Sequence, residues 1–182
     1  MQILEKLNGL LNEKDIQVQK NGTKLVGVPV RHYLYAPMTM QMQKELVASY
    51  RGDFPEELLQ IYGVTNGCTL FLTARKIGRI TIPFSQLNVY GVPCGRNAVD
   101  ALEPYSINVE DLGRPDNTPK TWLKFGSYSP VSADRAEWRL FVDTQDKRVY
   151  AEDADAKKCT AEAQWESIDA CLCDLFGRLQ NL

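Results

Sequence analysis

The chain has 182 residues, of which 44% are hydrophobic and 24% charged, values typical of one soluble globular domain. These proportions exclude a disordered chain, a collagen-like chain and a small disulfide-stapled scaffold. The 21 Lys and Arg residues nearly balance the 23 Asp and Glu residues, so the overall basic charge of many nucleic-acid-binding proteins is missing. Direct binding of nucleic acid is therefore not expected.

Charge is unevenly spread along the chain. Residues 1–99 hold 11 basic and 7 acidic side chains, whereas residues 100–182 hold 10 basic and 16 acidic ones. An acidic half can attract a basic partner, and a merely solubilising surface gives the same pattern. Both interpretations stay open on charge alone.

The N-terminus and the cysteines bear on location. Glu5 lies within the first residues and no long apolar run follows, so no signal peptide is predicted, and no stretch approaches the ~20 apolar residues of a membrane span. The five cysteines are an odd number without the spacing of a disulfide framework. A cytoplasmic protein with reduced thiols is expected.

The N-terminal segment is predicted to form a helix and a hairpin. Apolar residues at steps of three and four indicate a helix over 1–14. Alternating residues on both sides of Asn21-Gly22 predict a hairpin near 16–28, because both central residues of such a turn need positive φ.

Two more helices follow. The first is expected after Thr39, which would cap it, and extends to about Ser49. The second is expected from the segment around Pro55, with Asp53 as its cap and Pro55 in its first turn.

The rest of the chain is predicted to hold short strands and a closing helix. A helix is expected from about Glu162 to the end, because apolar residues recur there at steps of three and four. A loop with one short helix is expected over 94–119. The predicted strands are 68–73, 77–83, 88–92, 122–126, 139–143 and 148–151.

These elements predict an α+β fold with a mostly antiparallel central sheet and helices packed on it, because the strand connections are short. One domain, 1–182, is expected. The helix and hairpin within 1–35 are either part of that domain or an extension of it.

No catalytic constellation is recognisable. The single histidine, His32, lies between apolar and aromatic residues, which favours a structural role. Cys68 with His32 is the only candidate nucleophile and base, and no activating signature surrounds the cysteine. With no second histidine, no Cys-x-x-Cys and no glycine-rich phosphate loop, no metal or cofactor is predicted.

Several short motifs follow one another in a set order along the chain. They are Ala36-Pro37-Met38-Thr39, Phe54 to Tyr62, Asn66-Gly67, Cys68 to Phe71, Trp122 to Gly126, Leu140 to Asp143, Val149-Tyr150 and the closing helix from about Trp165. This order resembles the SUKH superfamily, a group of bacterial immunity proteins related to a fungal cell-wall synthesis regulator. The likeness spans about 36–180, matches poorly over 74–119, and does not include the hairpin at 16–28.

This resemblance implies a SUKH-like α+β fold and a non-enzymatic protein that binds and neutralises a cognate toxin, often a nuclease or deaminase. The shared residues are expected to be structural: Pro55 at a helix start, Asn66 and Gly67 in a turn, and Trp122 in the core. No catalytic residue is carried over, and the oligomeric state is left open.

Candidate partner-binding residues come from the acidic half, because acidic groups attract the basic cleft of a nuclease. Two other functions stay open: a regulatory or scaffolding protein-interaction domain, and an enzyme that uses Cys68 or His32. The candidate acidic residues are Glu103, Glu110, Asp111, Asp116, Glu152, Asp153 and Asp155.

Overall fold

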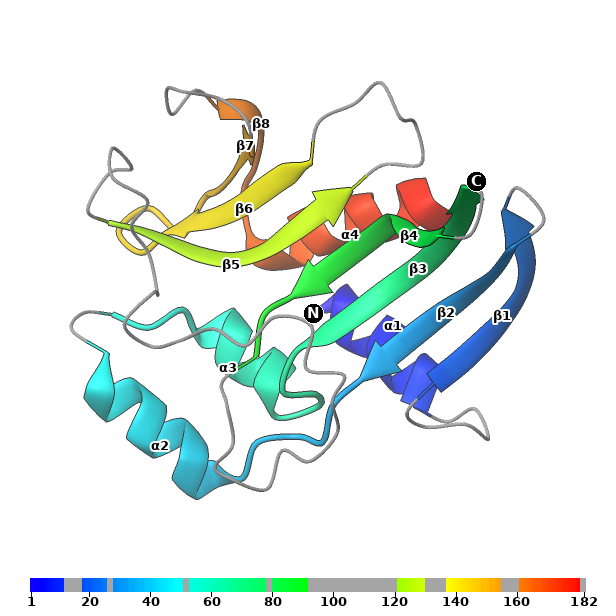
Figure 1. The fold of residues 1–182 in the computed structure, drawn as a ribbon. Helices are drawn as coiled ribbons and strands as arrows, with labels where there is room; N and C mark the ends of the chain where they lie inside the picture. The colour runs from blue at the N-terminus through cyan, green and yellow to red at the C-terminus, as the bar shows by residue number, and fades with distance from the viewer. Residues whose placement is uncertain are drawn as a thin grey trace.

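A single antiparallel sheet organises the chain in a computed structural model (Figure 1), which describes residues 1–11, 18–25, 28–50, 53–77, 80–91, 121–129, 137–154 and 161–180. Every strand pairs antiparallel with its neighbours in sequence, in the order β1-β2-β3-β4-β5-β6-β7-β8. The predicted α+β class with an antiparallel sheet is confirmed. The elements are α1 (Gln2–Leu11), β1 (Val18–Leu25), β2 (Val28–Leu34), α2 (Met40–Ser49), α3 (Glu56–Tyr62), β3 (Cys68–Ile77), β4 (Ile80–Val89), β5 (Trp122–Ser129), β6 (Trp138–Asp143), β7 (Val149–Asp153), β8 (Ala161–Trp165) and α4 (Ile168–Gln180).

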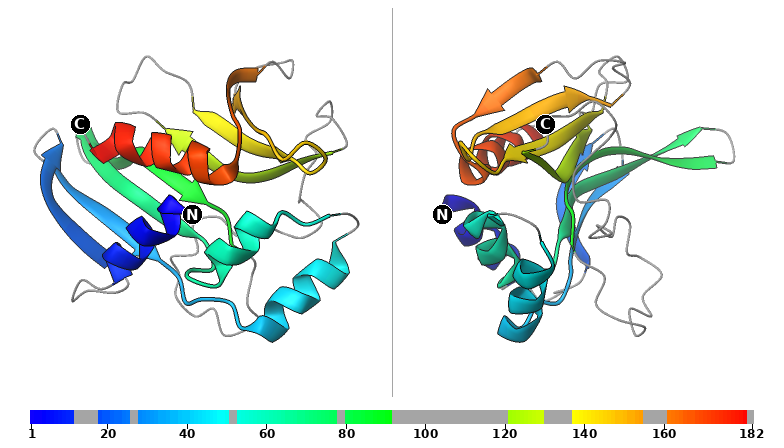
Figure 2. Two further views of the ribbon diagram at one scale, coloured as in Figure 1. Left: turned by 180° about the vertical axis from the view of Figure 1, so that it is seen from behind. Right: turned by 90° about the vertical axis from the view of Figure 1, so that its left-hand side faces the viewer.

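The core lies between one face of the sheet and the helices α1 and α4 (Figure 2). Strand side chains alternate between the two faces, so Leu140 and Val142 of β6 reach this core while Phe141 between them points to the other face. We call these the helix face and the far face. In α4 the buried positions recur at steps of three and four: Ile168, Cys171, Leu172, Leu175, Phe176 and Leu179.

Two carboxylates connect three of the helices. The Asp169 carboxylate of α4 accepts hydrogen bonds from the backbone N–H groups of Gln2 (3.0 Å) and Ile3 (2.8 Å) at the start of α1. The Glu57 carboxylate of α3 accepts one from the N–H of Ile168 (2.8 Å) at the start of α4. Each carboxylate therefore caps a distant helix and faces the positive end of its dipole.

A tight junction joins the end of α3 to the sheet. Gly67 has φ +84°, and a Cβ there would lie 2.6 Å from the Gly91 nitrogen and 2.8 Å from the Val89 carbonyl oxygen. The preceding Thr65 hydroxyl is 2.6 Å from the Gly67 carbonyl oxygen and accepts a hydrogen bond from the Tyr35 N–H. The predicted Asn-Gly turn into β3 is confirmed, and three chain segments meet at it.

The predicted N-terminal hairpin exists, but the prediction of a turn at Asn21-Gly22 is wrong. Both residues lie inside β1, where the register shifts between Asn21 and Lys24. Pairing with β2 continues to Leu25↔Val28, so the residues between Asn21 and Lys24 form a bulge in β1 rather than a turn.

Three other helix and strand limits differ from the prediction. The segment Ala161–Trp165 is β8 rather than helix, because pairing with β7 overrides the helix propensity of its Ala, Glu and Gln residues. The predicted strands at 77–83 and 88–92 are replaced by the continuous β4. Pro55, not Asp53, occupies the cap of α3, and the prediction of a side-chain cap there is wrong.

Thr39 does cap α2, accepting from the Met42 N–H. The expected loop and short helix at 94–119 lie outside the described residues.

The Gly67 junction predicts a stability difference between two glycine substitutions. Gly67→Ala places a methyl group against the Gly91 backbone at a positive φ, so we expect a loss of at least about 1–3 kcal/mol in the free energy of unfolding. Gly9→Ala, in α1 with no atom within 4 Å of the added carbon, is the control and should stabilise by about 0.5–1 kcal/mol. Urea denaturation measures both; equal effects would contradict this account.

Candidate functional site

The acidic residues singled out from the sequence are not one exposed group. Glu152 lies inside β7, one residue beyond the predicted end of that strand, and is only 3% exposed, so it is not part of the exposed surface. Asp153 ends the same strand and is half-buried. The remaining candidates fall outside the described residues: Glu103, Glu110, Asp111, Asp116 and Asp155.

Glu152 lies at one end of a row of polar side chains that crosses the far face of the sheet. Strand register places Thr69 beside Asn88, Asn88 beside Ser127, Ser127 beside Arg139 and Arg139 beside Glu152. We call these five residues the polar row. Sequence reasoning missed it, because its members lie far apart in the chain and only the strand register aligns them.

One end of the polar row is hydrogen-bonded and the other is not. The Thr69 hydroxyl donates to the Asn88 Oδ1 (2.8 Å), and the Asn88 Nδ2 donates to the Ser127 hydroxyl (3.0 Å). Arg139 donates through Nη2 to backbone carbonyls at the end of β7, whereas its Nε and the Glu152 Oε1 are buried without a partner. Unpartnered buried groups weaken a fold, so this end contributes less stability than the Thr69 end.

Trp122 also lies on the far face rather than in the core. Its ring stacks on Tyr150 with centroids 4.5 Å apart, and it approaches Phe141 at 5.8 Å. The Tyr150 hydroxyl donates to Asp146 at 3.2 Å. The prediction that Trp122 fills the core is wrong, because the register pairs it with Asp143 on the face opposite the helices.

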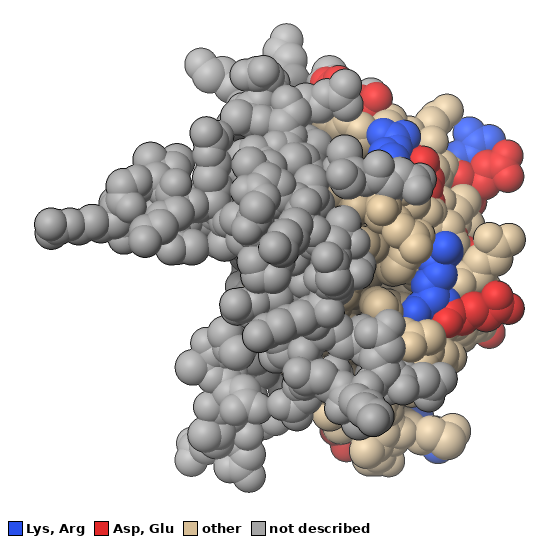
Figure 3. All heavy atoms as spheres, turned by 90° about the vertical axis from the view of Figure 1, so that its right-hand side faces the viewer, with Lys and Arg blue, Asp and Glu red and all other residues tan. Residues whose placement is uncertain are grey.

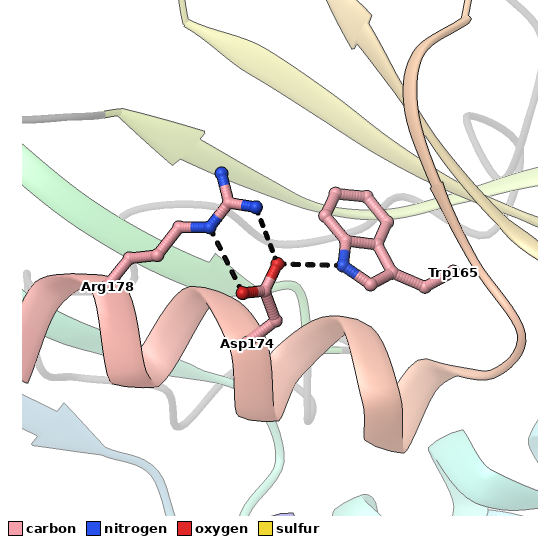
Figure 4. Close-up of polar contacts among 3 residues, drawn as sticks. All are labelled: Trp165, Asp174 and Arg178. Carbon is pink, nitrogen blue, oxygen red and sulfur yellow. Dashed lines mark hydrogen bonds and ion pairs between the residues drawn. The ribbon is translucent and has the colours of Figure 1, made fainter.

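A half-exposed aromatic and charged surface lies where α4 crosses β6 and β8 (Figure 4). The indole N–H of Trp165 donates to Asp174 Oδ2 (2.9 Å), and Arg178 binds the same carboxylate through Nε (3.1 Å) and Nη2 (2.8 Å). The Arg178 guanidinium also lies 6.0 Å from the centre of the Trp138 ring, which is 6.4 Å from that of Trp165. We call these four residues the tryptophan surface.

The tryptophan surface is accessible to solvent. The side chains of Arg178 and Asp174 are 44% and 37% exposed, and both tryptophans are half-buried against the core. The bidentate pair and the indole hydrogen bond hold these polar groups in one arrangement. The C-terminal helix predicted from the sequence included Trp165, but nothing in the sequence indicated that Trp138, Asp174 and Arg178 lie beside it.

The described C-terminal part of the chain carries the acidic surplus. Residues 137–154 and 161–180 together hold nine acidic and four basic side chains, and the tryptophan surface belongs to this part. Figure 3 shows one side of the molecule, where Lys and Arg lie beside Asp and Glu across the described atoms. The surplus of acidic side chains gives residues 137–154 and 161–180 a net negative charge.

His32 and Cys68 are unsuited to act together as base and nucleophile. His32 is 1% exposed; its Nδ1 accepts from the Phe71 N–H, and burial lowers its pKa to about 4. Burial raises the pKa of the Cys68 thiol to about 12. Near neutral pH both groups are uncharged, whereas a nucleophilic cysteine works as the thiolate.

Groups of three or more metal-ligating side chains are missing from the described ranges. Within the same ranges, no helix is long and apolar enough to cross a membrane.

Comparisons with protein-family models, with curated proteins and with solved structures found no match.

The lowered pKa of His32 predicts acid sensitivity. Because the pKa falls from 6.5 in the unfolded chain to about 4 in the folded one, the stabilisation from the neutral ring is complete above pH 6.5 and is lost between about pH 6.5 and 4. Between pH 7 and pH 5 the wild type should lose about 2 kcal/mol more than His32→Gln, whose amide oxygen can still accept from Phe71. Urea denaturation at both pH values measures this, and parallel losses would contradict it.

The polar row predicts a cost for removing its central amide. Asn88→Ala leaves the Thr69 and Ser127 hydroxyls without their partner, so we expect a loss of about 1–3 kcal/mol in the free energy of unfolding. Gln86→Ala, two residues away on the same strand, should change it by less than about 0.5 kcal/mol. Similar losses in the two variants would show that the row contributes nothing specific.

Proposed function

We propose that this chain is a non-enzymatic, cytoplasmic immunity protein of the SUKH type, which neutralises a nuclease- or deaminase-like toxin by binding it directly. The observation that carries the proposal is the tryptophan surface. Trp and Arg are the residues most concentrated among those that dominate binding energy at protein interfaces. Here Trp138, Trp165 and Arg178 lie together, half-exposed and held in place.

Charge supports a basic partner. The nine acidic and four basic side chains of the described C-terminal part give this region a negative field. Such a field raises the rate at which a basic protein associates, and the effect falls as salt is added. A toxin that cuts or deaminates nucleic acid has a basic substrate cleft, so the signs are complementary.

The chemistry of the buried groups favours binding over catalysis. The best nucleophile and base that the sequence offered, Cys68 and His32, are both buried, with their pKa values shifted away from the charged forms. The half-exposed polar groups of the tryptophan surface already satisfy one another, an arrangement typical of a preformed docking surface.

The proposal is tested by rescue and by affinity. A candidate toxin is sought among the genes next to this one, and cells that express the cognate toxin domain should survive only when this chain is co-expressed. The Asp174→Ala/Arg178→Ala variant should bind the purified toxin at least tenfold more weakly than the wild type, because it removes both charged partners of the surface. Lys44→Ala, an exposed change on α2, is the control and should bind within twofold.

Two results would overturn this account. Death of cells that co-express the wild-type chain would exclude immunity toward that toxin. Binding to several unrelated host proteins with similar affinity, and none to the toxin, would instead support the regulatory or scaffolding alternative.

A further inference from the structure

The strand β8 forms one end of the sheet. In the described part of the chain it pairs with β7 and with no other strand. Its other side is unpaired among the described strands, and the backbone groups of such an edge can pair with an added strand. The use that a partner can make of this edge depends on which backbone groups point outward and which side chains flank them.

The hydrogen bonds at the two ends of the β6–β7 pairing show which backbone groups of β7 point toward β6. The Asp143 N–H donates to the Arg148 carbonyl at 2.8 Å, and the Ala154 N–H donates to the Glu137 carbonyl at 2.7 Å. Bonded and non-bonded pairs alternate along an antiparallel ladder. Counting in register from either end gives the same answer: the backbone groups of Tyr150 are directed toward β6.

The backbone groups of β8 that point away from β7 can be identified in the same way. Tyr150 lies opposite Gln164, and since Tyr150 bonds to β6, the N–H and C=O of Gln164 point away from β7. Ala163 and Trp165, on either side, face β7. Gln164 is an exposed residue.

Acidic side chains flank this outward position. Glu162 and Glu166 are both exposed; Glu162 lies at the register shift between β7 and β8, and Glu166 directly follows the end of β8. Two copies of this edge would bring four carboxylates together, so pairing with a second copy of the chain is disfavoured. Lysine or arginine side chains of an added strand would meet these carboxylates with the opposite charge.

We propose that β8 binds an extended, basic segment of a protein partner, which joins the sheet as a further strand beside Gln164. This inference rests on the proposed protein-binding function and specifies the mode of binding. Main-chain hydrogen bonds to Gln164 provide affinity, and Glu162 and Glu166 select basic side chains. Trp165 connects the edge to the tryptophan surface, so one partner can contact both.

The test uses the whole chain and a synthetic peptide of ten alternating lysine and valine residues with blocked ends. Adding the peptide at millimolar concentration should slow hydrogen exchange at the Gln164 amide at least fivefold in NMR spectra. A peptide of alternating glutamate and valine should leave that amide unchanged, because its charge repels Glu162 and Glu166. Protection of Gln164 by both peptides would refute the charge selection.

Two variants at one position separate backbone pairing from the side chain. Gln164→Pro removes an outward N–H that takes no part in the ladder, so the fold should persist, as near-ultraviolet circular dichroism of the tryptophans can check. It should weaken binding of the lysine–valine peptide at least fivefold, whereas Gln164→Thr, which keeps the N–H, should bind as the wild type does. Equal binding by both variants, or no exchange protection at Gln164, overturns the inference.

The results distinguish a failure of this inference from a failure of the proposed function. If cells are rescued but Gln164 shows no protection, the toxin is bound without strand addition and only this inference fails. If Gln164 is protected but no cell is rescued, the edge binds basic segments and the immunity proposal fails.

Discussion

The meeting of three chain segments at Gly67 is the constraint on which the rest of the fold depends. The glycine lies against the backbone at the end of β4, and Thr65 before it contacts the segment after β2. The Tyr62 hydroxyl donates to the Tyr90 carbonyl beside the same place. The junction thereby fixes where α3 ends and where β3 begins. Because β3 lies between β2 and β4, the position of the whole N-terminal half of the sheet follows.

The two faces of the sheet serve different purposes. On the helix face, apolar side chains make a core that needs no polar partners, and the carboxylates of Glu57 and Asp169 hold the helices over it. On the far face, polar side chains meet across five strands and are satisfied at one end only. The tryptophan surface, which we propose for a partner, lies at the margin of the helix face, where Trp138 and Trp165 pack against the core beside α4.

The sequence predicted what is local and missed what depends on register. Helical periodicity identified α1 and α4, and the Asn66-Gly67 pair identified the turn into β3, because these signals come from neighbouring residues. The same reasoning assigned the segment from Glu162 to Trp165 to a helix, since only pairing with β7 makes it a strand. It also treated Glu152 as exposed, because only the pairing of β7 with β6 places this residue beside Arg139 within the sheet. The tryptophan surface was missed for the same reason.

The cap that Asp169 provides to α1 has a consequence for how the chain is made. Each strand of the sheet pairs with the strand before it in the chain, so the sheet can be extended one strand at a time as the chain leaves the ribosome. The first helix, in contrast, finds its cap 166 residues later. Synthesis must deliver the start of the last helix before the first can dock. The oldest part of a nascent molecule is thus among the last to be completed.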